Sequence, residues 1–213
     1  VPIMALIAGY LSIAGERESG SLKVLLGLPT TRGEVVVGKF LGRAAVVAVG
    51  VAAGFAVAGV VTALVFGTVP VVAFTGVIGL TAALGVSFVG IAIGISAVTA
   101  TRSRAMTLAV GTYLALTLLW DLVPQGIHLL LTGSMPGLTV PGWFLLLDGA
   151  SPSGAYDVLV QSLLMGGNGA LAGRLGGEVP LYLHEGVFLL VLLVWTVLPV
   201  ALGLRRFRVA DLS

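Results

Sequence analysis

The sequence predicts an all-α protein that lies in a membrane and crosses it several times. Hydrophobic residues make up 58% of its 213 residues, and charged residues only 9%. A soluble domain carries roughly 25% charged residues, so this chain has too few to cover a water-facing surface. Its apolar runs are long and uninterrupted, whereas the strands of a membrane barrel alternate apolar and polar residues. Helices are therefore expected, because they satisfy their own backbone hydrogen bonds within lipid.

Four apolar segments are long enough, or nearly long enough, to cross a bilayer, which takes about 20 helical residues. They are residues 44–66, 71–98, 105–120 and 186–204. An opening apolar run, residues 1–14, would be about 21 Å long as a helix, against a hydrocarbon core of roughly 30 Å. We therefore expect this run to be the end of a membrane helix in a chain truncated at its N-terminus.

Lysine and arginine give the expected orientation. If each of the four segments crosses the membrane, residues 15–43, 99–104 and 205–213 lie on one side, and they hold all of the 11 basic residues except Arg174. Cytoplasmic segments of membrane proteins carry an excess of Lys and Arg. The three stretches, with the C-terminus, are therefore expected in the cytoplasm of a multi-pass plasma-membrane protein.

Residues 121–185 are then expected on the extracytoplasmic side. The segment is rich in Gly and Pro but contains apolar stretches at 142–147 and 155–165. Trp120, just before it, is an aromatic residue typical of the membrane interface. One interpretation is a re-entrant region of short helices in the outer leaflet, and the other is an irregular loop over the helix ends.

The stretch "RGEVVVGKF" contains most of a phosphate-binding P-loop, G-x-x-x-x-G-K-[ST], at residues 33–39. Phe40 follows, where the motif needs a hydroxyl group for Mg²⁺. Thr31 and Glu34 also have the spacing of a helical capping box, which predicts a helix running through both glycines. A helix uses the backbone N–H groups that a phosphate cradle needs, so the sequence argues against a nucleotide site here.

Other patterns do not predict catalysis or metal binding. "HEGVF" at 184–188 begins like a zinc-protease motif but has Phe188 where the second His belongs, and His128 is the only other histidine. The chain has no cysteine, which excludes a thiolate metal site. The four spans contain no Lys, Arg, Asp or Glu in their interiors, where an ion-driven carrier would be expected to keep one. No catalytic, cofactor-binding or metal-binding residue is predicted.

The stretch "ERESGSLKVLLGLP", residues 16–29, is predicted to hold a short amphipathic helix that ends at Pro29. The leucines that share its apolar face are Leu22, Leu25 and Leu26. Lys23 is turned away from that face. The helix could rest on the inner leaflet, but Glu16 and Glu18 would then lie beside anionic headgroups, so a protein partner is favoured.

Residues 15–43 resemble the cytoplasmic segment of type-2 exporter permeases of ATP-binding-cassette (ABC) transporters. That pattern is Glu-Arg-Glu-x-Gly-(Ser/Thr)-Leu, a Leu-Leu-x-x-Pro step, Arg-x-Glu and Gly-Lys, and every part occurs between Glu16 and Lys39. "WDLVP" at 120–124 and the closing "LGLRRFRVADLS" also resemble the family. Within it, the chain is similar to the permeases of nitrous-oxide-reductase maturation systems.

The resemblance implies a six-helix permease bundle, with residues 1–213 forming a single transmembrane domain. Residues 16–29 would be the coupling helix, which docks on a separate ABC ATPase subunit. The docking residues implied are Glu16, Arg17, Glu18, Gly20, Leu22, Leu25, Leu26 and Pro29. ATP and Mg²⁺ would bind that subunit, so the permease is not itself an enzyme. It would pair with a second copy or a paralogue in the lipid bilayer, with no nucleic acid as partner, and couple hydrolysis to export.

Two other functions fit the same sequence: a non-transporting membrane scaffold or assembly factor with the same docking element, and an intramembrane enzyme. The substrate is not predicted, since hydroxyl-bearing apolar helices suit lipids, drugs and polymers equally. Three Gly-x-x-x-Gly pairs, at 38/42, 50/54 and 90/94, could form close helix contacts within or between permeases. Because the chain has 31 glycines, chance spacing is a competing explanation.

Overall fold

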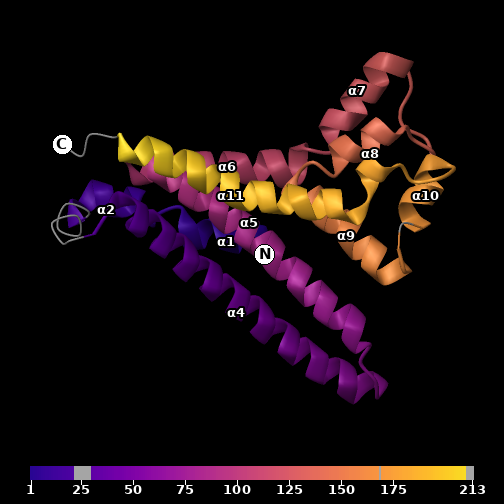
Figure 1. The fold of residues 1–213 in the computed structure, drawn as a ribbon, viewed down its shortest axis with the longest axis horizontal. Coiled ribbons are helices and arrows are strands. Elements are labelled where there is room, and N and C mark those ends of the chain that lie inside the picture. The colour runs from indigo at the N-terminus through magenta and orange to yellow at the C-terminus, as the bar shows by residue number, and fades with distance from the viewer. Residues whose placement is uncertain (22–29, 168, 210–213) are drawn as a thin grey trace. The chain divides into compact units, whose positions relative to one another are not determined.

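A computed structural model describes residues 1–21, 30–167 and 169–209. All regular elements among these residues are helices, which confirms the predicted all-α fold (Figure 1). Three of the described helices are long and apolar enough to cross a membrane: α4 (Arg32–Phe66), α5 (Val71–Val98) and α11 (Glu185–Arg208). The chain therefore has the composition and helix lengths of a polytopic membrane protein.

A fourth span is present if a bent pair of helices is counted as one. Residues 102–119 comprise α6 (Arg102–Tyr113) and the π-helix η1 (Leu114–Leu119), and α7 (Leu122–Thr132) follows at an angle of 50°. A π-helical turn is a recognised cause of sharp bends, because it interrupts the regular i→i−4 hydrogen bonds. The predicted span 105–120 thus begins earlier, at Arg102, and continues past its predicted end as a bent helix.

The remaining described helices are shorter. They are α1 (Pro2–Gly9), α2 (Ala14–Ser19), α8 (Gly142–Asp148), α9 (Pro152–Met165), α10 (Gly169–Leu175) and the 3₁₀ turn η2 (Leu181–Leu183). The apolar stretches noted at 142–147 and 155–165 fall within α8 and α9. The region between α7 and α11 is therefore largely helical rather than an irregular loop.

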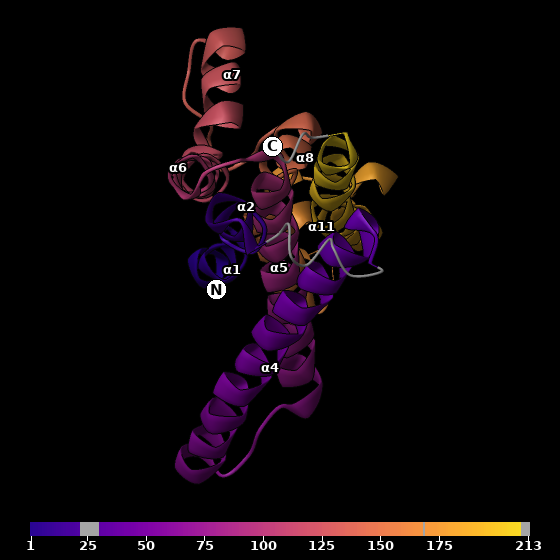
Figure 2. The ribbon, with the colours of Figure 1, turned by 90° about the vertical axis from the view of Figure 1, so that its left-hand side faces the viewer.

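The chain divides into two compact units. The first comprises residues 1–54, 82–113 and 194–213, and the second comprises residues 55–81 and 114–193. In the first unit α1 and α2 both lie against α6 (Figures 1 and 2). In the second, α7 packs on α8, and α9 packs on both α10 and η1.

Glycines bring α5 and α11 into close contact in the first unit. A Cβ atom built at Gly94 would lie 2.5 Å from the carbonyl oxygen of Pro199, and one at Gly203 would lie 2.8 Å from the Cα of Gly94. The hydroxyl groups of Ser87 and Thr196 share a hydrogen bond of 2.9 Å between the same two helices. Small residues allow this backbone approach where lipid offers no hydrophobic driving force between helices.

An ion pair and aromatic contacts hold the second unit together around α8. Arg174 lies 3.5 Å from the carboxylate of Asp148 and its guanidinium lies over the ring of Phe144, which also contacts His128 edge-on. Burial raises the pKa of Asp148, and the Arg174 guanidinium opposes that rise. The one basic residue outside the three basic stretches is thus bound to a carboxylate of its own unit.

Candidate coupling site

Three of the implied docking residues, Glu16, Arg17 and Glu18, lie on α2. Gly20 ends this helix with φ +78°, a left-handed conformation that glycine adopts without strain. The other implied docking residues, Leu22, Leu25, Leu26 and Pro29, lie in residues 22–29, outside the described part of the chain. The described geometry therefore concerns the first residues of the predicted coupling element, on α2, and the start of α4, which follows the element.

The joint between α1 and α2 is fixed by α5. The hydroxyl oxygen of Ser96 accepts hydrogen bonds from the backbone N–H groups of Ile13 and Ala14, each 2.9 Å long. The first N–H groups of a helix have no partner within it, so Ser96 supplies the missing acceptor for α2. All three residues are fully buried, which makes this joint a well-anchored part of the first unit.

Glu16 connects α2 to α4. Its Oε1 atom lies 2.6 Å from the Nζ of Lys39 in an ion pair whose side chains are 37% and 21% exposed, respectively. Its other oxygen, Oε2, is buried and has no hydrogen-bond partner among the described residues. The Glu16 carboxylate is thus turned into the chain.

Glu18 connects α2 to α6. Its Oε2 atom accepts a hydrogen bond of 2.5 Å from the backbone N–H of Arg102, the first residue of α6. The N-terminus of a helix carries a partial positive charge and unpaired N–H groups, so a carboxylate there is favourable. Glu18, although far from α6 in the sequence, therefore supplies a hydrogen-bond acceptor for the N-terminus of that helix.

The start of α4 has the predicted capping box. The backbone N–H of Thr31 donates to the Glu34 carboxylate at 2.7 Å, and the Glu34 N–H donates to the Thr31 hydroxyl at 3.2 Å. Helix α4 then runs without interruption through residues 33–39 to Phe66. Its internal hydrogen bonds use the N–H groups beyond the first turn, as the sequence argument against a P-loop expects.

Arg32, the first residue of α4, joins that helix to the end of α11. Its guanidinium donates to the carbonyl oxygens of Phe207 and Arg208, at 2.8 and 3.0 Å, and lies 5.7 Å from the centre of the Phe207 ring. The last carbonyls of a helix lack partners within it and carry partial negative charge, so a cation stabilises them. The first residues of the predicted coupling element, on α2, and the start of α4, which follows the element, are therefore each bonded to membrane helices.

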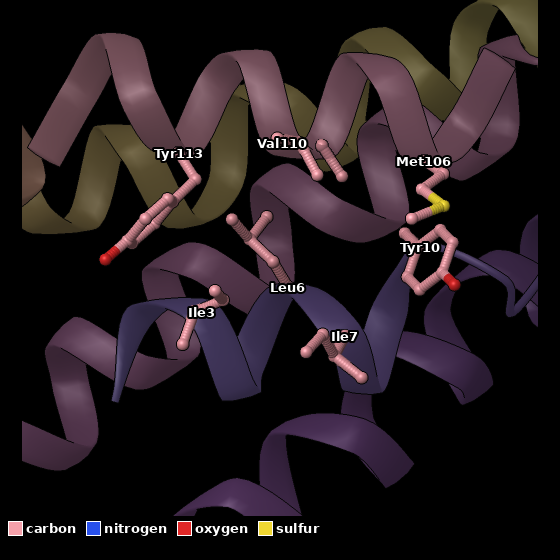
Figure 3. A pocket seen from close by; sticks show the side chains of 8 residues that line it. Ile3, Leu6, Ile7, Tyr10, Met106, Val110 and Tyr113 are labelled. Carbon is pink, nitrogen blue, oxygen red and sulfur yellow. The ribbon is translucent and has the colours of Figure 1, made fainter. Parts of the chain in front are cut away.

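A pocket of about 340 Å³ lies between α1 and α6 in the first unit (Figure 3). Its lining residues are Ile3, Leu6, Ile7, Tyr10, Met106, Ala109, Val110 and Tyr113. The surface is almost wholly carbon, with the hydroxyl groups of Tyr10 and Tyr113 at opposite ends (Figure 3). Its volume is at the lower end of the roughly 300–1,000 Å³ of small-molecule sites. Its chemistry suits an apolar molecule or a lipid tail.

Comparison with known proteins identifies the family. Residues 1–212 match the family model of the ABC-2 family transporter proteins. The chain belongs to the ABC-2 transporter family. The resemblance drawn from residues 15–43 and from the closing segment is thus confirmed over nearly the whole chain.

Two curated relatives of this ABC-2 family chain carry the name "Probable ABC transporter permease protein NosY". The chain is 31% identical over 219 residues to the one from Pseudomonas aeruginosa and 31% identical over 213 residues to the one from Stutzerimonas stutzeri. Each match covers 98% of this chain and 75% of the relative. The chain is accordingly a multi-pass membrane permease of the ABC transporter type, a class that works with an ATPase subunit.

The partners of the two glutamates and the roles of Ser96 and Arg32 could not be identified from the sequence. Lys39, Arg102 and Ser96 are distant from α2 in sequence, and only the fold brings them to it. One local signal was available. The Glu-x-Glu spacing points two carboxylates to opposite sides of a helix, so two different partners could have been expected.

Proposed function

We propose that this permease couples ATP hydrolysis on a separate ABC ATPase subunit to the export of a substrate across the plasma membrane. The observation that carries the proposal is that the described segments on either side of residues 22–29, α2 and the start of α4, are both bonded to membrane helices. A short element attached in this way can pass a movement of the ATPase subunit into the membrane. The names of the NosY relatives support an ABC transporter permease.

ATP and Mg²⁺ would bind the ATPase subunit, and the permease would act with a second copy or a paralogue. We infer that residues 15–43, 99–104 and 205–213 face the cytoplasm, because these three stretches hold all the basic residues except Arg174. The coupling element and the C-terminus lie within them. The pocket between α1 and α6 is open to an apolar ligand. This apolar surface does not specify the chemical identity of the exported substrate.

The function is tested by reconstituting the permease with its ATPase subunit in proteoliposomes. Val110 lines the pocket and is 48% exposed, and the chain has no native cysteine. A Val110→Cys variant is expected to react with a maleimide at a rate that changes several-fold when MgATP is added, because transport requires alternating access. A non-transporting scaffold would bind the ATPase subunit with no such change, and that result would refute the proposed function.

The proposed orientation is tested with single cysteines in intact cells. Ser103, on α6, and Ser134, after α7, are both exposed. We expect Ser134→Cys to react with a membrane-impermeant maleimide from outside and Ser103→Cys to react only after the cells are permeabilised. The opposite pattern would place the basic stretches outside the cytoplasm and would contradict docking to a cytoplasmic ATPase.

A further inference from the structure

Two glutamates implied as docking contacts, Glu16 and Glu18, both bond within this chain. Glu16 pairs with Lys39 on α4, and Glu18 accepts the first N–H of α6. Successive side chains of an α-helix are rotated by about 100° about the helix axis, so side chains two residues apart point to nearly opposite sides. The Glu-x-Glu spacing thus directs one carboxylate to α4 and the other to α6, and Figure 2 shows α2 between these helices.

From this geometry we propose that Glu16 and Glu18 are transmission residues, which attach α2 to α4 and α6 so that a displacement of the coupling element moves both helices. The inference rests on the proposed function and assigns these two residues a role other than contact with the ATPase subunit. They are positioning residues: they touch neither nucleotide nor substrate, and they act through the helices that they hold.

The state of the Glu16 carboxylate favours an internal role. One oxygen is engaged at 2.6 Å by Lys39, and the other is buried. A docking subunit that bound this carboxylate would have to share it with Lys39 of α4. Glu18 is exposed, but its bonded oxygen satisfies a helix N-terminus that would otherwise lack an acceptor.

Two further contacts complete the attachment. Ser96 holds the α1–α2 joint against α5, so α2 has a fixed pivot at its start. Arg32 bonds the start of α4 to the last carbonyls of α11. A movement entering through α2 and α4 can therefore reach α5, α6 and α11 through bonded contacts rather than through apolar packing alone.

The absence of native cysteine allows a direct test with pairs of spin labels. One pair, at Ser19 on α2 and Leu41 on α4, reports the link through Glu16; a second, at Ser19 and Ser103 on α6, reports the link through Glu18. All three positions are exposed. Label distances are measured in the complex with the ATPase subunit, without nucleotide and with MgATP and vanadate.

The expected result is a selective loss of each link. In the wild-type chain both distances stay the same when MgATP and vanadate are added. Glu16→Ala should shift or broaden the α2–α4 distance by several ångströms and leave α2–α6 unchanged, and Glu18→Ala should do the reverse. The exchange Glu16→Lys with Lys39→Glu should restore the wild-type α2–α4 distance. Both alanine variants should fold, since a partly exposed ion pair contributes little to stability. Binding of the ATPase subunit should stay within about twofold of wild type, because both carboxylates bond within this chain.

Other outcomes overturn the proposal. If Glu16→Ala weakens ATPase-subunit binding tenfold or more, Glu16 is a docking contact and the transmission role is wrong. If neither alanine variant alters a distance, the carboxylates do not carry the movement. A wild-type permease that fails to bind the ATPase subunit would refute the proposed function and, with it, this inference. Glu178→Ala, which removes an exposed acid in the second unit, is the matched control and should behave as wild type.

Discussion

The variant Leu25→Asp is expected to lose nearly all ATP-dependent coupling to the ATPase subunit. Leu25 shares the apolar face of the predicted coupling helix with Leu22 and Leu26. A carboxylate in a buried apolar contact has no compensating partner, and its burial is strongly unfavourable. Loss of a hot-spot residue costs an interface about 2 kcal/mol or more, which corresponds to a roughly 30-fold loss of affinity. The affinity of the ATPase subunit and the ATP-dependent response at Val110→Cys would measure this loss.

The matched control for this change is Lys23→Asp. Lys23 lies on the same predicted helix and is turned away from the leucine face, so an acid there should leave the affinity close to wild type. Equal effects of the two variants would indicate a general response to negative charge instead of a specific apolar face. An unaltered affinity and response in Leu25→Asp would show that the coupling helix has been assigned to the wrong residues.

Elements specified by local sequence were predictable. Helix α5 has the same bounds, 71–98, as the uninterrupted apolar run that predicted it. The capping box at Thr31 and Glu34 was equally accessible, because both of its hydrogen bonds join residues three apart. Length, hydropathy and capping act within one helix, so one sequence is enough to specify them.

The bend after α6 was not predictable in the same way. Hydropathy continues through the π-helix η1, and nothing in its composition separates it from an ordinary α-helix. The indole N–H of Trp120, just after η1, donates to the carbonyl oxygen of Leu147 at 2.9 Å, which fixes the junction to α8. That contact joins residues far apart in the sequence. The early start of α6 has a similar cause, since Glu18 supplies an acceptor at Arg102.

The coupling site also has a part that the sequence predicts and a part that depends on contacts between residues far apart in the sequence. The family pattern identified residues 15–43 as the functional region, but it could not tell an outward contact from an inward one. The partners of Glu16, Glu18 and Arg32 within the chain depend on where α4 and α6 begin and where α11 ends. A sequence pattern of this kind therefore locates the region and leaves the role of each side chain to the structure.

The glycine pairs show how one motif can have different outcomes. Gly90 and Gly94 on α5 lie against the backbone of α11, whereas Gly38, Gly42, Gly50 and Gly54 on α4 have no atom of the described chain near a built Cβ. The i, i+4 spacing is the same in every pair. Only the position of the neighbouring helix distinguishes a packed pair from an open one.

Gly94→Val is consequently expected to destabilise the permease strongly, whereas Gly50→Val is not. The new Cβ at position 94 would lie 2.5 Å from the Pro199 carbonyl oxygen. The backbone atoms of α5 and α11 cannot rotate away from this contact as a flexible side chain would. Overpacking of this kind costs about 1–3 kcal/mol. At about 2–4 °C per kcal/mol for a chain of this size, the unfolding midpoint in detergent should fall by several degrees. Tryptophan fluorescence is a suitable probe, since the chain has three tryptophans.

The control at Gly50 also carries information of its own. A Cβ atom there would have no atom of another described segment within 4 Å, so the unfolding midpoint of the isolated permease should match wild type. If Gly94→Val unfolds at the wild-type temperature, the close contact between α5 and α11 is wrong. If Gly50→Val keeps its midpoint but weakens self-association of the permease, the open glycines of α4 pack against a second copy. Unchanged self-association would instead leave that face of α4 to lipid.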